Sequence, residues 1–184
     1  MYFHFGTRKI IEAAAVMLRL SPCGRMNYMS LLKLLYIADR ESLKETGRPI
    51  VGTKTIAMKR GPLHSDVYDL IKGGHFDAPI WAEFIRTDGY EVALVGQPGV
   101  LHLSRYEIEK LTETFKRYQE MDEWELADAT HAFPEWISNH REGTSAPIPM
   151  ESILEAVGRS QDKEEILRDA EEVRALNRLL GVPA

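Results

Sequence analysis

Apolar residues recur at helical spacing along most of the chain, and turn signals divide this pattern into segments. In the first segment, residues 7–20, the apolar side consists of Ile10, Ile11, Ala14, Met17 and Leu18. This spacing predicts an amphipathic helix capped at Thr7. The helix should end at residues 21–24, Ser-Pro-Cys-Gly, because proline and glycine both oppose continuation.

Two further helices follow in the first half. Asn27 is placed to cap one that reaches Thr46, with Gly47 as a left-handed stop. Another begins near residues 64–65 and closes at Lys72 before two glycines. Between these helices we expect a turn over 47–53 and a short strand over 55–59, which Gly61-Pro62 breaks.

The middle of the chain predicts a small antiparallel sheet. Residues 80–87 and 90–95 form the clearest hairpin, because Asp88-Gly89 suits a two-residue turn. With that loop, Ile85 faces Val92, and residue 86 faces residue 91. Residues 100–103 add a further strand.

The remaining pattern is helical again. Ser104 and Glu107 form a capping box for a helix that reaches residue 119. Further helices are expected over 122–131, 134–140, 150–157 and 162–180, with a loop over 142–149. The predicted fold class is therefore α+β and mostly α-helical, a helical bundle with a small antiparallel sheet in the middle. A length of 184 residues favours one domain over 1–184.

Composition narrows the compartment. No apolar run approaches the ~20 residues that span a bilayer, and Glu12 interrupts the alanine-rich stretch that imitates a signal peptide. The single cysteine, Cys23, cannot form an internal disulfide and is typical of a reducing compartment. We therefore expect a cytoplasmic protein and no membrane partner.

Charge is distributed unevenly along the chain. Residues 1–80 hold 12 Lys and Arg against 7 Asp and Glu, whereas residues 81–184 hold 11 against 21. A basic first half raises nucleic acid as a partner, but its basic residues are scattered instead of clustered. An ordinary solvated surface is the favoured interpretation, and we do not expect nucleic acid to bind.

Catalytic motifs are missing from the sequence. It contains no phosphate-binding GxxxxGK[ST] loop, no GxSxG, no HExxH and no paired CxxC. Its six histidines include no i, i+4 pair on a predicted helix, so nothing indicates a metal site. We expect no enzyme, no cofactor and no metal.

Asp39 interrupts the apolar side of the second helix, where an unpaired carboxylate is costly. We expect it to form a structural ion pair with a basic residue such as Lys59 or Arg60. A catalytic role is the less favoured alternative, because a lone acid without a partner base makes a poor mechanism.

Three strings carry a family resemblance: LLKLLYIADRESLKETGRPI at 31–50, IAMKRGPLHSDVYDLIK at 56–72 and LADATHAFPEW at 126–136. In order and spacing they resemble the Panacea domain of SocA-type antitoxins, over roughly residues 7–155. The helix over 162–180 lies outside the resemblance, as a family-variable extension. Its apolar stripe, residues 166, 170, 173, 176 and 180, is expected to pack in the core or to dock the partner.

The resemblance implies a bacterial or prophage-encoded antitoxin of a type II toxin–antitoxin system. Such a protein neutralises a cognate protein toxin, encoded by an adjacent gene, through direct protein–protein binding. As an alternative, one branch of the family acts as a proteolytic adaptor that delivers its toxin to the ClpXP protease. A DNA-binding autoregulator of its own operon is a further alternative, and a homo-oligomer stays open.

The resemblance carries over to individual residues as structural positions or as candidate contacts. Structural positions are expected at Lys33, Tyr36, Asp39, Arg40, Gly61, Pro62, Ser65 and Thr130, with Ser65 capping the third helix. Candidate partner-binding residues are Lys59, Arg60, His64, Tyr68, His131 and Trp136, because Tyr, Trp and Arg are the usual interface anchors. Among these, Lys59, His64 and Tyr68 are expected to be exposed.

Overall fold

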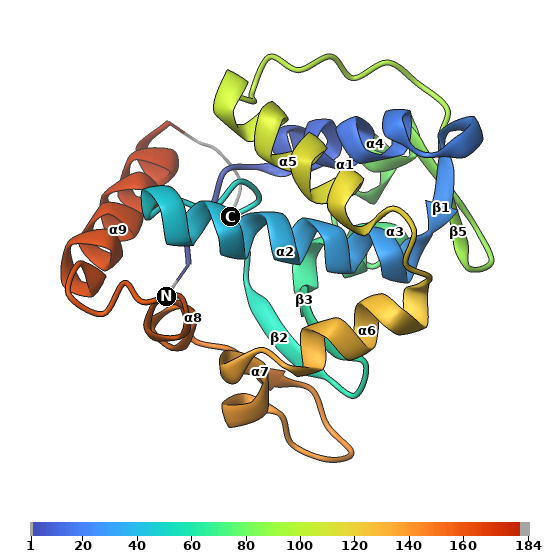
Figure 1. Ribbon diagram of the computed structural model, residues 1–184. Coiled ribbons are helices and arrows are strands. Elements are labelled where there is room, and N and C mark those ends of the chain that lie inside the picture. Colours follow the sequence, from blue (N-terminus) through green and yellow to red (C-terminus); the bar gives the residue numbers. More distant parts are fainter. Residues whose placement is uncertain (1, 181–184) are drawn as a thin grey trace.

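Helix α2, Tyr28–Thr46, runs through the middle of the molecule, and most other elements pack around it (Figure 1). The computed structural model describes residues 2–180; Met1 and residues 181–184, which the domain prediction includes, lie outside the described residues. Helices α1, α5 and α6, Thr7–Leu20, Arg105–Tyr118 and Glu123–His131, all contact α2. The mostly helical α+β class is confirmed.

Two of the predicted side-chain caps form as expected, at the start of α2 and of α5. The Asn27 side chain accepts a hydrogen bond from the backbone N–H of Met29, and Gly47 ends α2 with a φ of 75°. Ser104 and Asp122 each form a complete capping box, at α5 and at α6. These local signals placed the helices correctly because each satisfies backbone groups that the helix leaves unpaired.

Two other predicted caps are wrong. The N-cap of α1 is Gly6 and not Thr7, whose hydroxyl instead donates to Asp77 Oδ2 at 2.5 Å. Helix α3, Ser65–Lys72, has His64 as its N-cap, while Ser65 Oγ donates to the backbone carbonyl of Lys54. In both cases the hydroxyl donates to an acceptor that is distant in sequence and does not cap its own helix.

The first sheet has the strand order β1-β5-β4, with bounds Arg25–Asn27, Glu91–Leu94 and Ile85–Asp88. The hairpin exists, but its predicted register is wrong: Ile85 pairs with Leu94, and Val92 with Thr87. Gly89 and Tyr90 form the turn, in which only the glycine takes a positive φ, and the backbone carbonyl of Tyr90 accepts from Tyr28. The slip of two residues keeps Ile85 and Val92 buried.

The predicted strands also differ at their ends. Residues 100–103 are irregular, and β1 supplies the third strand of this sheet instead. Part of the segment expected as a strand is a short helix, α4, Ala78–Ala82.

The second sheet has the order β3-β2-β6, with bounds Gly61–His64, Thr55–Met58 and Ala146–Pro147. The expectation that Gly61-Pro62 breaks strand structure is wrong, because these residues begin β3, which pairs with β2. Pro62 is tolerated because β3 is an edge strand. The predicted loop over 142–149 contains β6, which pairs with the other side of β2.

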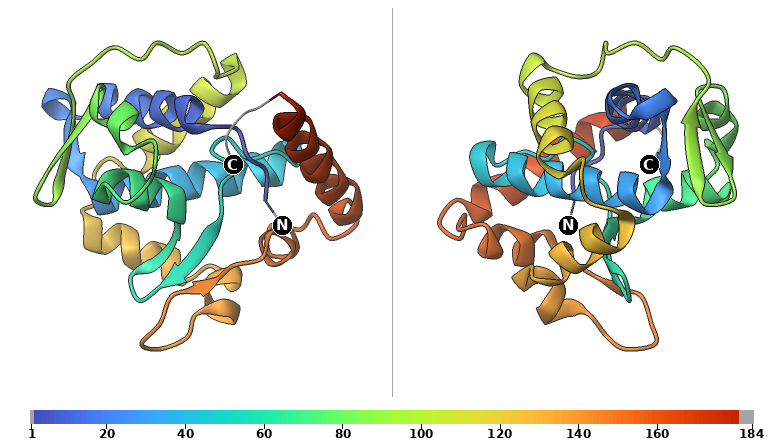
Figure 2. Two further views of the ribbon diagram at one scale, coloured as in Figure 1. Left: turned by 180° about the vertical axis from the view of Figure 1, so that it is seen from behind. Right: turned by 45° about the vertical axis from the view of Figure 1, so that its right-hand side comes forward.

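The C-terminal third continues through α7, α8 and α9, Pro134–Asn139, Met150–Ala156 and Lys163–Leu179. Helix α9 lies beside the N-terminal segment and the end of α2 (Figure 2). Of its predicted stripe, Ile166 and Ala170 are buried with Phe3, whereas Leu176 and Leu180 are exposed. No helix among residues 2–180 is long and apolar enough to cross a membrane.

Candidate functional site

Asp39 anchors the chain that follows α2. Its carboxylate accepts hydrogen bonds from the backbone N–H groups of Ile50, Val51 and Gly52 at 2.7–2.9 Å. Its Oδ2 also lies 3.2 Å from His64 Nε2. The predicted ion pair with Lys59 or Arg60 is therefore wrong, because three backbone N–H groups compensate this buried carboxylate.

Glu135 is the centre of a second buried cluster. Its Oε1 accepts from the Tyr36 hydroxyl at 2.8 Å and from Arg40 Nε at 2.7 Å. The Arg40 guanidinium also lies 4.3 Å from the centre of the Phe133 ring. Burial, together with the Glu135 carboxylate, raises the pKa of Tyr36 well above its usual value, so this hydroxyl stays protonated and donates. The cluster ties α7 to α2.

Lys33 lies at the contact between α2 and β3. Its amino group is buried and donates to the Pro62 carbonyl at 2.8 Å. Desolvation by burial lowers its pKa to about 7. Gly61, with a φ of 94°, passes so close to Lys33 and Thr130 that a Cβ atom would meet both side chains.

Trp136 links α7 to β2 by donating its indole N–H to the Met58 carbonyl at 3.0 Å. Its ring lies between His131 and His140, with ring centres 4.2 and 4.5 Å away. Desolvation, followed by the charge of Lys33, lowers the pKa of His131. The stacked rings and this hydrogen bond therefore hold α7 against β2.

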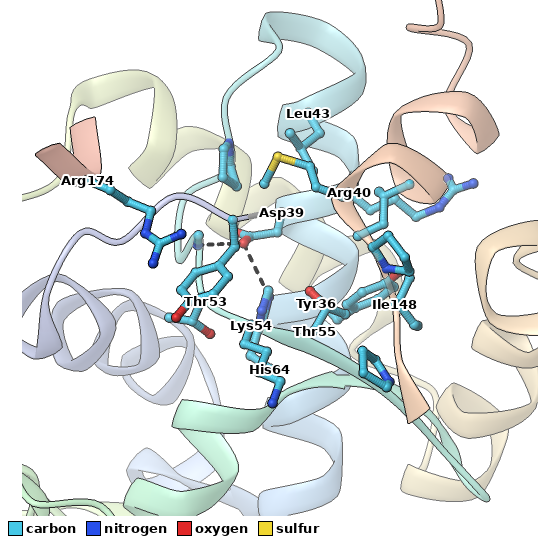
Figure 3. Close-up of a pocket in the computed structure, with 17 residues that line it drawn as sticks. Tyr36, Asp39, Arg40, Leu43, Thr53, Lys54, Thr55, His64, Ile148 and Arg174 are labelled. Atoms are coloured by element: carbon cyan, nitrogen blue, oxygen red, sulfur yellow. Dashed lines mark hydrogen bonds and ion pairs between the residues drawn. The ribbon is translucent and has the colours of Figure 1, made fainter. Parts of the chain in front are cut away.

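A cleft of about 390 Å³ opens beside the Asp39 anchor (Figure 3). Tyr36, Asp39 and His64 form part of its lining, together with Ile148 and with Arg174 from α9. Among the described residues no group of three or more His, Cys, Asp or Glu could hold a metal ion.

A different surface gathers aromatic and cationic side chains, and we call it the aromatic face; it comprises Tyr28, Arg60, Tyr68, Lys72, Tyr90 and Trp124. Its members contact one another in two groups, Arg60 with Trp124, and Lys72 with the three tyrosines. Arg60 lies 4.3 Å from the Trp124 ring centre, Lys72 lies 4.1 Å from that of Tyr28, and Tyr28 and Tyr90 stack at 6.1 Å. Trp124 is 52% exposed and Tyr90 71%.

The aromatic face is also hollowed. One pocket of about 220 Å³ has Tyr28, Lys59, Arg60 and Tyr68 in its lining, with Lys33 at its inner end. An adjoining one is lined by Tyr28, Arg60, Tyr90 and Trp124 among others. The two hollows share Tyr28 and Arg60, so the aromatic face is one continuous surface.

The predicted partner contacts fall in three places. Lys59, Arg60 and Tyr68 lie together at the aromatic face. His131 and Trp136 stack with each other beside α7, and His64, expected to be exposed, is 3% exposed in the cleft wall.

Other residues at these sites were missed from the sequence. Glu135 looks like an ordinary helical surface glutamate, yet its side chain is fully buried. Trp124 and Tyr90 come from segments that are distant in sequence from Arg60. An exposed tryptophan in a capped helix was the available signal for the aromatic face.

Tyrosine, tryptophan and arginine, which are enriched where proteins bind other proteins, gather here on a hollowed surface. The family model of the antitoxin SocA-like Panacea domain matches residues 31–137, more than half of the chain, and the chain belongs to this family. No curated protein and no solved structure matches it. The family-model match confirms the resemblance given by the three strings.

Proposed function

We propose that this protein is an antitoxin that neutralises a cognate protein toxin by binding it directly on the aromatic face. The toxin would be encoded by an adjacent gene of a bacterium or prophage. Membership of the antitoxin-like family supports the class, and the aromatic face is the observation that carries the mode of action.

The aromatic side chains of this face are held in place before any partner binds. Arg60 stacks on Trp124, and Lys72 lies over Tyr28 and, at 5.8 Å, over Tyr68. Tyr28 begins α2 and Trp124 lies in the first turn of α6, so rigid helices carry both rings. Ordered aromatic anchors lose less entropy on association, which favours affinity.

The positive charge of the aromatic face suggests which side chains its partner presents. Lys59, Arg60 and Lys72 form no ion pair with a carboxylate of residues 2–180. Glu123 lines the same surface and accepts a hydrogen bond from the neutral Asn27 amide at 3.0 Å, so one carboxylate stands against these three cations. We therefore expect the toxin to present acidic side chains around an apolar recess that receives Trp124.

Co-expression with the neighbouring gene tests the proposal. Trp124→Ala and Arg60→Glu should each abolish rescue from toxicity and weaken the purified complex by about 30-fold or more, the loss typical of an anchor. The matched controls are Leu101→Ala, at an apolar residue that is 92% exposed, and Arg178→Glu, on α9. If the face variants bind as the controls do, this face is not the docking site; if the neighbouring protein is harmless alone, the antitoxin role is wrong.

The manner of neutralisation is tested in a host that lacks ClpXP. Masking of the toxin by the aromatic face predicts full rescue in that host. Rescue that disappears while toxin accumulates would instead support delivery to the protease. Binding to promoter DNA that falls steeply with salt would support autoregulation, and no binding at low salt would end that alternative.

A further inference from the structure

The cleft beside Asp39 contains buried polar atoms that lack a partner. Thr53 and His64 are each 3% exposed, and both line the cleft. Thr53 Oγ1 and His64 Nδ1 form no hydrogen bond with any described residue. Buried polar groups are normally hydrogen-bonded, so two such atoms in one cavity wall indicate a ligand that supplies their partners.

The cleft also carries positive charge that the protein does not neutralise. Lys54 and Arg174 line it, and neither forms an ion pair with a carboxylate of residues 2–180. The Arg174 guanidinium lies 4.9 Å from the centre of the Tyr2 ring, which holds it beside the opening. The other two charges are already engaged, since Arg40 binds Glu135 and Asp39 accepts three backbone N–H groups.

A further part of the lining is apolar and includes three prolines. It consists of Leu43, Pro49, Pro147, Ile148, Pro149, Met150 and Ile153. Figure 3 shows Leu43 and Ile148 on the side of the cleft away from Arg174. A volume of about 390 Å³ lies within the usual range of small-molecule sites.

We propose that this cleft binds a small organic anion that has one carboxylate or phosphate group and an apolar body. The anionic group faces Lys54 and Arg174 and accepts a hydrogen bond from Thr53, while His64 Nδ1 forms a further polar contact. The apolar body packs against Ile148, the residues that follow it and Leu43. Charge-assisted hydrogen bonds in a partly enclosed site are the interactions that hold such ligands.

The walls of the site come from two different parts of the chain. Tyr36, Asp39 and His64 lie within residues 31–137, the region that the family model matches. Arg174, Tyr2 and the segment 147–153 lie outside it. Residues inside and outside the region that the family model matches thus line the cleft together, so the proposed anion would contact both.

Titration of the full chain with small probes, followed in ¹H–¹⁵N spectra, tests this site. The probes are benzoate, hexanoate and phenyl phosphate, with benzyl alcohol as a neutral analogue and inorganic phosphate as an anion without an apolar body. We expect saturable shifts at the Thr53 and His64 amides for the organic anions. Comparing the dissociation constants of benzoate and phenyl phosphate shows whether the site prefers a carboxylate or a phosphate group. The dissociation constants of the organic anions should be about tenfold or more below that of benzyl alcohol, the difference that one charge-assisted contact gives.

Variants separate the roles of charge and hydroxyl. Lys54→Gln with Arg174→Gln should weaken binding of the anions, whereas the matched pair Lys44→Gln with Arg178→Gln, on exposed positions of α2 and α9, should not. Thr53→Ser should bind as the wild type does, and Thr53→Val should bind more weakly. Absence of saturation, equal binding of benzyl alcohol, or equal affinity in both charge pairs would overturn the proposal. None of these readouts involves the toxin, so the result is independent of the antitoxin assay.

Discussion

Substituting alanine for Gly61 tests how closely β3 packs against α2 and α6. Gly61 takes a φ of 94°, where a side chain is strained. A Cβ atom there would lie 3.0 Å from Lys33 Nζ and well inside van der Waals contact with Thr130 Oγ1. Gly99 provides the matched control, because its φ of 80° is also positive but a Cβ atom would meet nothing within 4 Å.

The two glycine variants therefore differ in one physical respect. Positive φ costs both of them about 1–2 kcal/mol. Only Gly61→Ala also overpacks a buried contact, which adds about 1–3 kcal/mol. We expect Gly61→Ala to lower the free energy of unfolding by about 2–5 kcal/mol and Gly99→Ala by about 1–2 kcal/mol.

Urea denaturation followed by circular dichroism measures both values. Adding Thr130→Ala removes the atom that the new methyl group meets, so it should cost less in the Gly61→Ala background than in the wild type, with a coupling of about 0.5 kcal/mol or more. Equal costs for the two glycine variants, or strict additivity with Thr130→Ala, would refute the close-packing explanation.

Three further predictions concern buried charges. Glu135→Ala should lower the free energy of unfolding by about 3–5 kcal/mol, because it removes the carboxylate that the Tyr36 hydroxyl and the Arg40 guanidinium bind. The triple variant Tyr36→Phe, Arg40→Met, Glu135→Leu should recover most of this loss. A loss below about 1 kcal/mol in Glu135→Ala would contradict the role of the cluster. The pKa of Lys33 falls from 10.5 to about 7 on folding, so between these pH values the unfolded chain binds more protons than the folded chain. The free energy of unfolding of the wild type, relative to that of Lys33→Met, should therefore rise by up to about 1.4 kcal/mol per pH unit in this range. A difference that does not change with pH would exclude the pKa shift. Asp39→Asn should cost about 1.5–3 kcal/mol and speed amide hydrogen exchange of residues 50–52, whereas unchanged exchange there would show that other contacts hold this segment.

Helices with side-chain caps were predictable because their signals are local. Asn27, Ser104 and Asp122 each bind backbone N–H groups within three residues, so a short stretch of sequence contains the whole interaction. The sheets depended on distant partners. Strand β1 has three residues and pairs with β5, which lies more than 60 residues later in the sequence. No pattern within Arg25–Asn27 predicts that pairing.

The same distinction applies to the candidate sites. The apolar side of the second predicted helix identified Asp39 as a residue that needs compensation. Its donors are the backbone N–H groups of residues 50–52, which no side-chain pattern in the sequence indicates. The Glu135 carboxylate is buried only because α7 packs on α2. Lys59, Arg60 and Tyr68 lie near one another in sequence, whereas Trp124 and Tyr90 lie beside them only through the fold.

The contact between the N-terminal segment and α9 has a consequence for the order of assembly during synthesis. The Asn177 side chain donates to the His4 carbonyl, Arg174 lies over Tyr2, and Phe3 is buried in the core cluster that contains Ile166. Residues 2–5 are synthesised before α9, and their partners on that helix are made more than 150 residues later. Phe3 and Phe5 lie close to Gly52 and can pack there earlier, but the contacts with α9 form only after residues 163–179 have been made. The N-terminal segment therefore reaches its final packing late in the synthesis of residues 2–180.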